Sequence, residues 1–149
     1  MLLVAGFGWA KPVMINPMVL RQRSESAPML VALAGPLSNL FMAVAAAIPV
    51  QAGLIDIRGA GFLPLLLQEF VWINLLLMLF NLLPIPPLDG EKILMYFLPP
   101  AGQSVMMRIR PYGSLILLAL IFVLPRMGVD VLSFLIVGPM LALFRLLLG

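Results

Sequence analysis

Long runs of apolar residues, interrupted by short segments rich in proline, glycine and charge, dominate the chain. Four such runs cover about residues 29–50, 62–83, 112–124 and 131–148. A helix needs roughly 20 apolar residues to cross a bilayer, so the first, second and fourth runs are long enough. The third run is short and has to begin earlier, near Ile109, or lie in a thinned region. The pattern predicts an all-α polytopic membrane protein with about four transmembrane helices.

Proline and glycine predict where these helices break. Clusters of the two residue types lie at 6–17, 35–36, 59–64, 84–90 and 99–102. The apolar segment 88–98 is too short to span a bilayer, so we expect it to form a half-helix. Near the N-terminus, residues 13–15 lie between proline-containing segments and predict a short β segment.

Composition supports the membrane assignment. Hydrophobic residues make up 63% of the 149 residues and charged residues only 10%, whereas soluble chains carry roughly 25% charged residues. There is too little polar surface for an ordinary cytosolic enzyme, a disordered chain or a nucleic-acid-binding domain. We therefore expect a lipid bilayer and no nucleic acid among its partners.

The distribution of positive charge predicts an orientation in the membrane. With four crossings, two basic residues, Arg58 and Arg126, fall on one side. The other seven fall on the opposite side: Lys11, Arg21, Arg23, Lys92, Arg108, Arg110 and Arg145. The positive-inside rule then places both termini and the 84–111 region in the cytoplasm.

The segment over residues 81–90, NLLPIPPLDG, places three prolines within four positions at the end of the second apolar run. Pro84 and Pro86 cannot continue a helical hydrogen-bond ladder. Irregular backbone at membrane depth is stable only inside protein or beside water, so this break is expected to line a polar cavity. With Pro87 in the first turn of the next helix, Asp89 lies near its N-terminus, where the dipole favours an ionised carboxylate.

Two interpretations of Asp89 stay open at this point. Pro-Leu-Asp-Gly is a good type I turn that implies no function. The enclosing apolar sequence and nearby Asn81 instead favour a functional carboxylate, serving as a metal ligand or an ion site within the membrane.

Three motifs resemble the site-2 protease family, the intramembrane zinc metalloproteases. Residues 81–90 are similar to that family's N-x-x-P-x-P-x-x-D-G signature, and residues 34–39, AGPLSN, to its A-G-P-x-x-N. Residues 8–17, GWAKPVMINP, resemble the G-W-A-K-P-V-x-x-N-P segment of a compact bacterial branch. The matches occur in the family's order and cover about residues 6–98, whereas about the last 40 residues match only as apolar helices. The resemblance to a bacterial branch implies a bacterial cell membrane.

The resemblance implies a role for each matched position in the break. Asp89 would be the third zinc ligand. Asn81 would lie beside the active site as a catalytic residue, where its amide could hold substrate backbone or a developing oxyanion. Pro84 lies in the stretch that receives the unwound substrate.

The other two motifs carry weaker implications. The strand around residues 9–15, which includes Trp9 and Val13, would pair its backbone with that of an extended substrate, because a helical peptide bond must be unwound before attack. An interfacial loop anchored by Trp9 and Lys11 is the alternative. For Asn39, an amide that ties helices together within the bilayer is the favoured interpretation.

The family's H-E-x-x-H helix has no counterpart here, because the 149 residues contain no histidine and no cysteine. In that motif two histidines one turn apart bind zinc, and the glutamate activates the bound water. Asp89 alone matches a ligand position, and Glu91, two residues on, is expected to point elsewhere.

Residues 1–5 resemble the tail of a transmembrane helix, so we expect a truncated family member or a misassigned start. The resulting layout is a single membrane domain. It comprises a helix remnant with a strand or loop segment (1–28), a protease-like core (29–98) and a C-terminal helical hairpin (99–149).

The expected function is that of a site-2-type zinc metalloprotease that cleaves transmembrane or signal-type segments, with this chain inactive on its own. The alternative is a non-catalytic membrane protein that binds transmembrane partners. An H-E-x-x-H helix encoded in frame upstream of Met1 would favour the enzyme, and a stop codon with a promoter would favour the binding protein. A transporter ranks third, because transport sites on broken helices normally accompany an internal repeat and we find only one proline-rich break.

Overall fold

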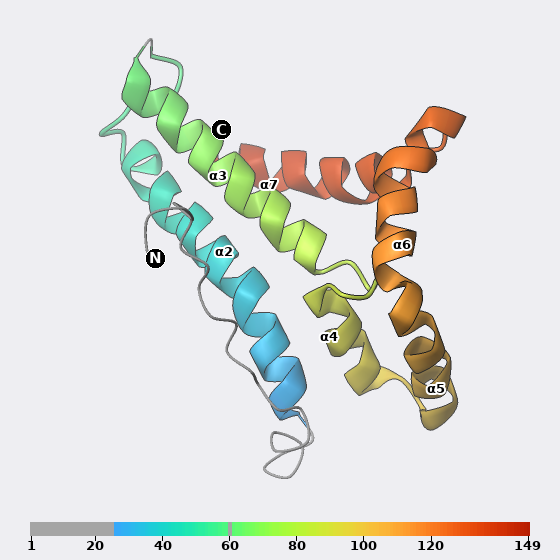
Figure 1. Cartoon of the computed structure of the whole chain (residues 1–149). Coiled ribbons are helices and arrows are strands. Elements are labelled where there is room, and N and C mark those ends of the chain that lie inside the picture. Colours follow the sequence, from blue (N-terminus) through green and yellow to red (C-terminus); the bar gives the residue numbers. More distant parts are fainter. Residues whose placement is uncertain (1–25, 60) are drawn as a thin grey trace, which may run out of the picture.

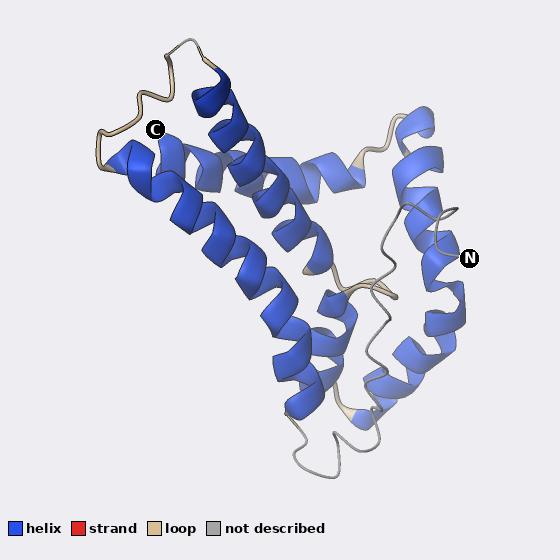
Figure 2. Ribbon diagram, turned by 60° about the vertical axis from the view of Figure 1, so that its left-hand side comes forward, coloured by secondary structure: helices blue, strands red, loops and turns tan. Residues whose placement is uncertain are grey.

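The computed structural model describes residues 26–59 and 61–149, and within these residues the chain is built of apolar helices (Figure 1). The longest are α2 (Ala27–Gln51) and α3 (Phe62–Asn81), which pack side by side. No strand occurs in this part of the chain (Figure 2). The all-α class is therefore confirmed for the described residues.

The N-terminal β segment expected at residues 13–15 cannot be compared with the structure. Trp9, Val13 and the whole GWAKPVMINP motif lie outside the described residues. The division of the chain into remnant, core and hairpin also stays a prediction.

The third apolar run forms a longer helical stretch than its sequence pattern predicts. α5 (Pro100–Ile109) continues through the 3-10 turn η1 (Arg110–Tyr112), α6 (Gly113–Leu118) and the π-helical turn η2 (Ala119–Val123). Together these elements make a 24-residue candidate span, long enough to cross a membrane. The polar residues at its start concealed that length in the sequence.

Three helical stretches of the described chain are long and apolar enough to cross a membrane: 27–51, 62–81 and 100–123. After η3 (Pro125–Met127), the fourth run forms η4 (Ser133–Val137) and α7 (Gly138–Leu148), a shorter helix over 133–148. The expected count of four transmembrane helices is therefore not confirmed.

The prediction of a helix break at Gly35 and Pro36 is wrong, because α2 continues through both residues. Pro36 removes one backbone donor, but it is buried and the rest of the helical ladder continues. In lipid, losing one hydrogen bond costs less than exposing the several polar groups that an open break would leave without partners.

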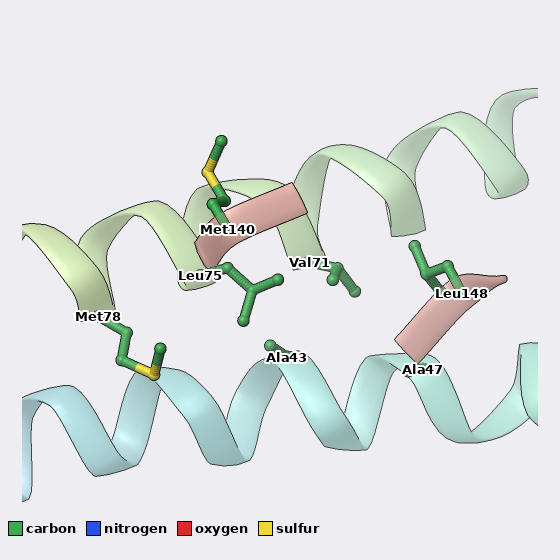
Figure 3. Close-up of a cluster of buried hydrophobic side chains, with 7 residues drawn as sticks. All are labelled: Ala43, Ala47, Val71, Leu75, Met78, Met140 and Leu148. Atoms are coloured by element: carbon green, nitrogen blue, oxygen red, sulfur yellow. The ribbon is translucent and has the colours of Figure 1, made fainter. Parts of the chain in front are cut away.

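A small core joins α2, α3 and α7 (Figure 3). Ala43 and Ala47 lie one turn apart on α2, and their small side chains let α3 approach closely. Leu75 of α3 is fully buried against them. The remaining members of this core are Val71, Met78, Met140 and Leu148. Through this core, α7 packs against both α2 and α3.

The C-terminal end of α7 lies beside the end of α2 that is opposite to Ser26. The side-chain amide of Gln51 donates to the carbonyl oxygens of Leu146 (3.5 Å) and Leu147 (3.2 Å). Gly149 borders the same hollow as the 53–58 loop. The helix over 133–148 packs against α3, and the expectation that both termini lie on the cytoplasmic side of the membrane stays a prediction.

Candidate functional site at the helix break

The proline-rich segment produces the predicted break. α3 ends at Asn81, and the 9-residue α4 (Asp89–Phe97) follows after an irregular stretch over 82–88. Within the stretch, the backbone N–H of Ile85 donates to the Leu83 carbonyl at 2.8 Å and that of Leu88 to the Ile85 carbonyl at 2.9 Å. The half-helix is therefore confirmed, and tight turns satisfy part of the backbone that the helix would have paired.

The start of α4 folds back against the end of α3, and glycine makes this possible. A Cβ atom added to Gly90 would lie 2.2 Å from the carbonyl oxygen of Leu82 and 2.3 Å from that of Leu83. No side chain fits at these distances, so the glycine of the Asp-Gly pair is required by close backbone approach.

Asp89 is the first residue of α4, and Leu88 in an extended conformation precedes it. The prediction that the Asp89 carboxylate lies near a helix N-terminus is therefore confirmed. Pro87 differs from expectation, since it lies before the helix and not in its first turn. The helix begins later because the extended backbone of Leu88 separates the two.

The carboxylate of Asp89 lies between α4 and α2. Its Oδ1 accepts a hydrogen bond from Lys92 Nζ at 2.8 Å, and 29% of the side chain is exposed. Its Oδ2 faces Gly35, where an added Cβ would come within 3.1 Å. Two motifs far apart in sequence, AGPLSN and NLLPIPPLDG, are thus brought into contact at this carboxylate.

Two further residues of the break were predicted from the sequence, Asn81 and Pro84. Asn81 is half-buried at the end of α3, and Pro84 is exposed within the irregular stretch. The polar cavity expected here stays a prediction. A hollow of about 520 Å³ lies at the opposite end of α3, between Gln68 and Phe144 among others.

Asn39 is half-buried within α2. Its expected role, tying helices together through its amide, also stays a prediction. A different amide, that of Asn74, is the buried one on α3, and it donates to the Phe70 carbonyl of its own helix at 2.8 Å.

Glu91 is the residue that sequence reasoning undervalued. It does point away from Asp89, as expected, but its side chain is only 3% exposed and is paired with Arg110. The signal was a charged residue placed inside an apolar segment, which is costly unless a partner is present. Nothing in the sequence identified Arg110 as that partner.

The donors present do not by themselves fit a catalytic zinc ion, which takes three protein ligands and one open position. Within residues 26–59 and 61–149, no group of three or more acidic, histidine or cysteine side chains could hold a metal ion. Asp89 offers one carboxylate, and that of Glu91 is occupied by Arg110.

Comparison with known proteins adds independent evidence. Residues 52–124 match the model of "Peptidase family M50", a range that includes α3, the break, α4 and the third candidate span. The chain is also 39% identical over 135 residues to "Putative zinc metalloprotease YwhC" of Bacillus subtilis (strain 168). That match covers 84% of this chain and 58% of the relative, so the chain spans little more than half the length of that protein. No solved structure matches the chain.

Proposed function

Because residues 52–124 match the model of Peptidase family M50, the site-2 protease family, we propose that the chain is part of an intramembrane zinc metalloprotease that cleaves transmembrane segments. The observation that carries the proposal is the carboxylate of Asp89. It stands at the start of α4, within a break between apolar helices, against the glycine of a second family motif.

Asp89 supplies one oxygen ligand to zinc in this proposal, and two histidines supply the others. Since the 149 residues contain no histidine, the histidine pair comes from outside them. The zinc ion would polarise water for attack on a peptide bond. On its own, the chain is expected to be inactive.

The break itself suits the substrate. A transmembrane substrate is helical, and its peptide bonds are shielded until it unwinds. Asn81, at the edge of the break, is proposed to hold substrate backbone or the oxyanion through its amide. Pro84 lines the receiving stretch, and Trp9 and Val13 are proposed to offer a strand edge to the extended substrate.

The membrane orientation follows from charge. Three basic residues lie at the end of the bundle that holds the start of α2, α4 and α5: Lys92, Arg108 and Arg110. Three more precede α2 in the sequence: Lys11, Arg21 and Arg23. Arg58, Arg126 and Arg145 belong to the other end. We infer that the break opens toward the cytoplasmic side. Cleavage is then expected near that face.

The proposal is tested by supplying the missing ligands. The complemented chain is the 149 residues co-expressed with, or fused to, the H-E-x-x-H helix of another family member. It should cleave a transmembrane reporter. Asp89→Ala should abolish cleavage, and Asn81→Ala should slow it on the order of a hundredfold, the loss typical of one oxyanion donor.

The matched control removes a carboxylate elsewhere. Glu69 is exposed on α3, and Glu69→Ala should cleave as the unmodified complemented chain does. Undiminished cleavage by the Asp89→Ala variant would remove Asp89 from the mechanism. If the complemented chain binds the reporter without cutting it, the alternative of a non-catalytic binding protein is favoured.

A further inference from the structure

A buried ion pair links the Asp89-bearing helix to the third candidate span. Glu91 lies in the first turn of α4, and Arg110 lies where α5 passes into η1. The Glu91 side chain is 3% exposed, whereas that of Arg110 is 52% exposed. The carboxylate is therefore enclosed by protein and receives its counter-charge from a guanidinium group that reaches the surface.

The contact is geometrically specific. Both Nε (3.0 Å) and Nη2 (2.6 Å) of Arg110 donate to Oε1 of Glu91. Two charge-assisted hydrogen bonds from one planar guanidinium restrict the direction of approach as well as the distance. A lysine at this position could supply the charge but not the paired donors.

A second contact lies nearby and joins the third candidate span to the break that precedes α4. A Cβ added to Gly113 at the start of α6 would lie 2.4 Å from both the Cβ and the carbonyl oxygen of Pro86 in the break. The third candidate span therefore holds the break through backbone packing at one point and α4 through an ion pair at another.

The helical period connects Glu91 to Asp89. Residues two positions apart on an α-helix point in directions about 200° apart, which is nearly opposite. On α4, Glu91 is held toward Arg110 while Asp89 faces Gly35 of α2. Because α4 has only nine residues, an ion pair on one of its faces fixes the rotation of the helix about its axis. That rotation determines the direction in which the side chain of Asp89, on the opposite face, points.

We propose that Glu91 and Arg110 form a positioning pair that fixes the rotation of α4 and so directs the Asp89 carboxylate toward Gly35. The pair does not itself touch metal or substrate. Its importance for catalysis rests on the proposed function, in which Asp89 is a zinc ligand, but its effect on the direction of residue 89 can be measured separately.

Cysteine cross-linking measures that direction, because the chain contains no native cysteine. In a background of Gly35→Cys and Asp89→Cys, oxidation should form a disulfide rapidly. Arg110→Gln leaves a buried carboxylate without a partner and should slow cross-linking about tenfold. Adding Glu91→Gln to Arg110→Gln should restore part of the rate, because the unpaired charge is gone. Arg110→Lys should be intermediate.

Arg108→Gln is the matched control. Arg108 is exposed on α5 and forms no salt bridge among the described residues, so this variant should cross-link at the unmodified rate. Thermal unfolding of each variant in detergent identifies any that are simply unfolded at the assay temperature. If Arg110→Gln is unfolded, Glu91→Gln alone is compared with the unmodified chain. We expect it to be folded and to cross-link more slowly.

Two results would overturn the positioning role: cross-linking by Arg110→Gln and Glu91→Gln at the unmodified rate, or equal slowing by Arg108→Gln. The proposed function is judged on a separate readout, the zinc content of the complemented chain with and without Asp89→Ala. Zinc content that does not depend on Asp89 would reject the metal site and leave the cross-linking result standing.

Discussion

Individual residues in the break are constrained by close backbone approach more than by their chemistry. Gly90 and Gly113 each occupy a position where a methyl group would overlap backbone atoms of the 82–86 segment. Gly35 leaves the space that the Asp89 carboxylate faces. Gly90 and Gly113 are therefore explained by close backbone approach, and Gly35 by the space beside the Asp89 carboxylate.

Gly90→Ala provides the residue-scale prediction. The added methyl group would meet the carbonyl oxygens of Leu82 and Leu83, so the variant should lower the free energy of unfolding by about 1–3 kcal/mol, as overpacking typically does. Denaturant unfolding in detergent measures the change. Gly138→Ala is the control, because nothing lies within 4 Å of its added Cβ. Equal stability of the two variants would show that α4 does not fold back as described.

At the scale of the helix ends, Asp130 acts as a cap. It precedes the helical residues 131 and 132, and its carboxylate accepts hydrogen bonds from the Ser133 hydroxyl (2.6 Å) and backbone N–H (3.0 Å). The hydroxyl first, and then the N–H, lower the pKa of the Asp130 carboxyl below its ordinary value. The ionised form is thus favoured in the folded state.

The sign of the pH effect follows from that lowered pKa. Asp130 stabilises the fold above its unfolded pKa, and this contribution is lost as the pH falls through the lower folded value. Asp130→Asn keeps a capping oxygen but cannot titrate, so its stability should vary less with pH in the acid range. Thermal unfolding across that range provides the measurement. If the stability of Asp130→Asn varied with pH in the acid range as much as that of the unmodified chain, Asp130 would not act as a cap.

Helices were predicted from the sequence wherever apolar residues ran without interruption, as in α2 and α3, and the three prolines before Asp89 located the break. The α7 packing was not predictable, because a run of apolar residues at 131–148 is equally compatible with a crossing and with packing across α3. The Glu91–Arg110 contact was hidden too, since it joins residues 19 apart on separate elements.

At the scale of the whole described chain, the 53–58 loop and Gly149 lie at one end of the three candidate spans, and the start of α2, α4 and α5 lies at the other. Simple alternation of four crossings would instead place Gly149 at the same end as the start of α2. The break and the Asp89 carboxylate belong to the same half of the bundle as Lys92, Arg108 and Arg110.

Single cysteines test this arrangement. A membrane-impermeant thiol reagent should label Arg58→Cys and Gly149→Cys from the same side of sealed vesicles, and Arg108→Cys only from the other. The unmodified chain, which has no cysteine, provides the blank. Labelling of Gly149→Cys from the same side as Arg108→Cys would show instead that the helix over 133–148 crosses the membrane as a fourth span.

The most direct measurement of the central claim is zinc content, determined on purified protein by elemental analysis. The 149 residues alone should hold well under one zinc ion per chain, because a single carboxylate binds it weakly. The complemented chain should hold about one, and its Asp89→Ala variant far less. Stoichiometric zinc in the isolated chain, or undiminished zinc in the complemented Asp89→Ala variant, would contradict the assignment of Asp89 as the ligand that this chain contributes.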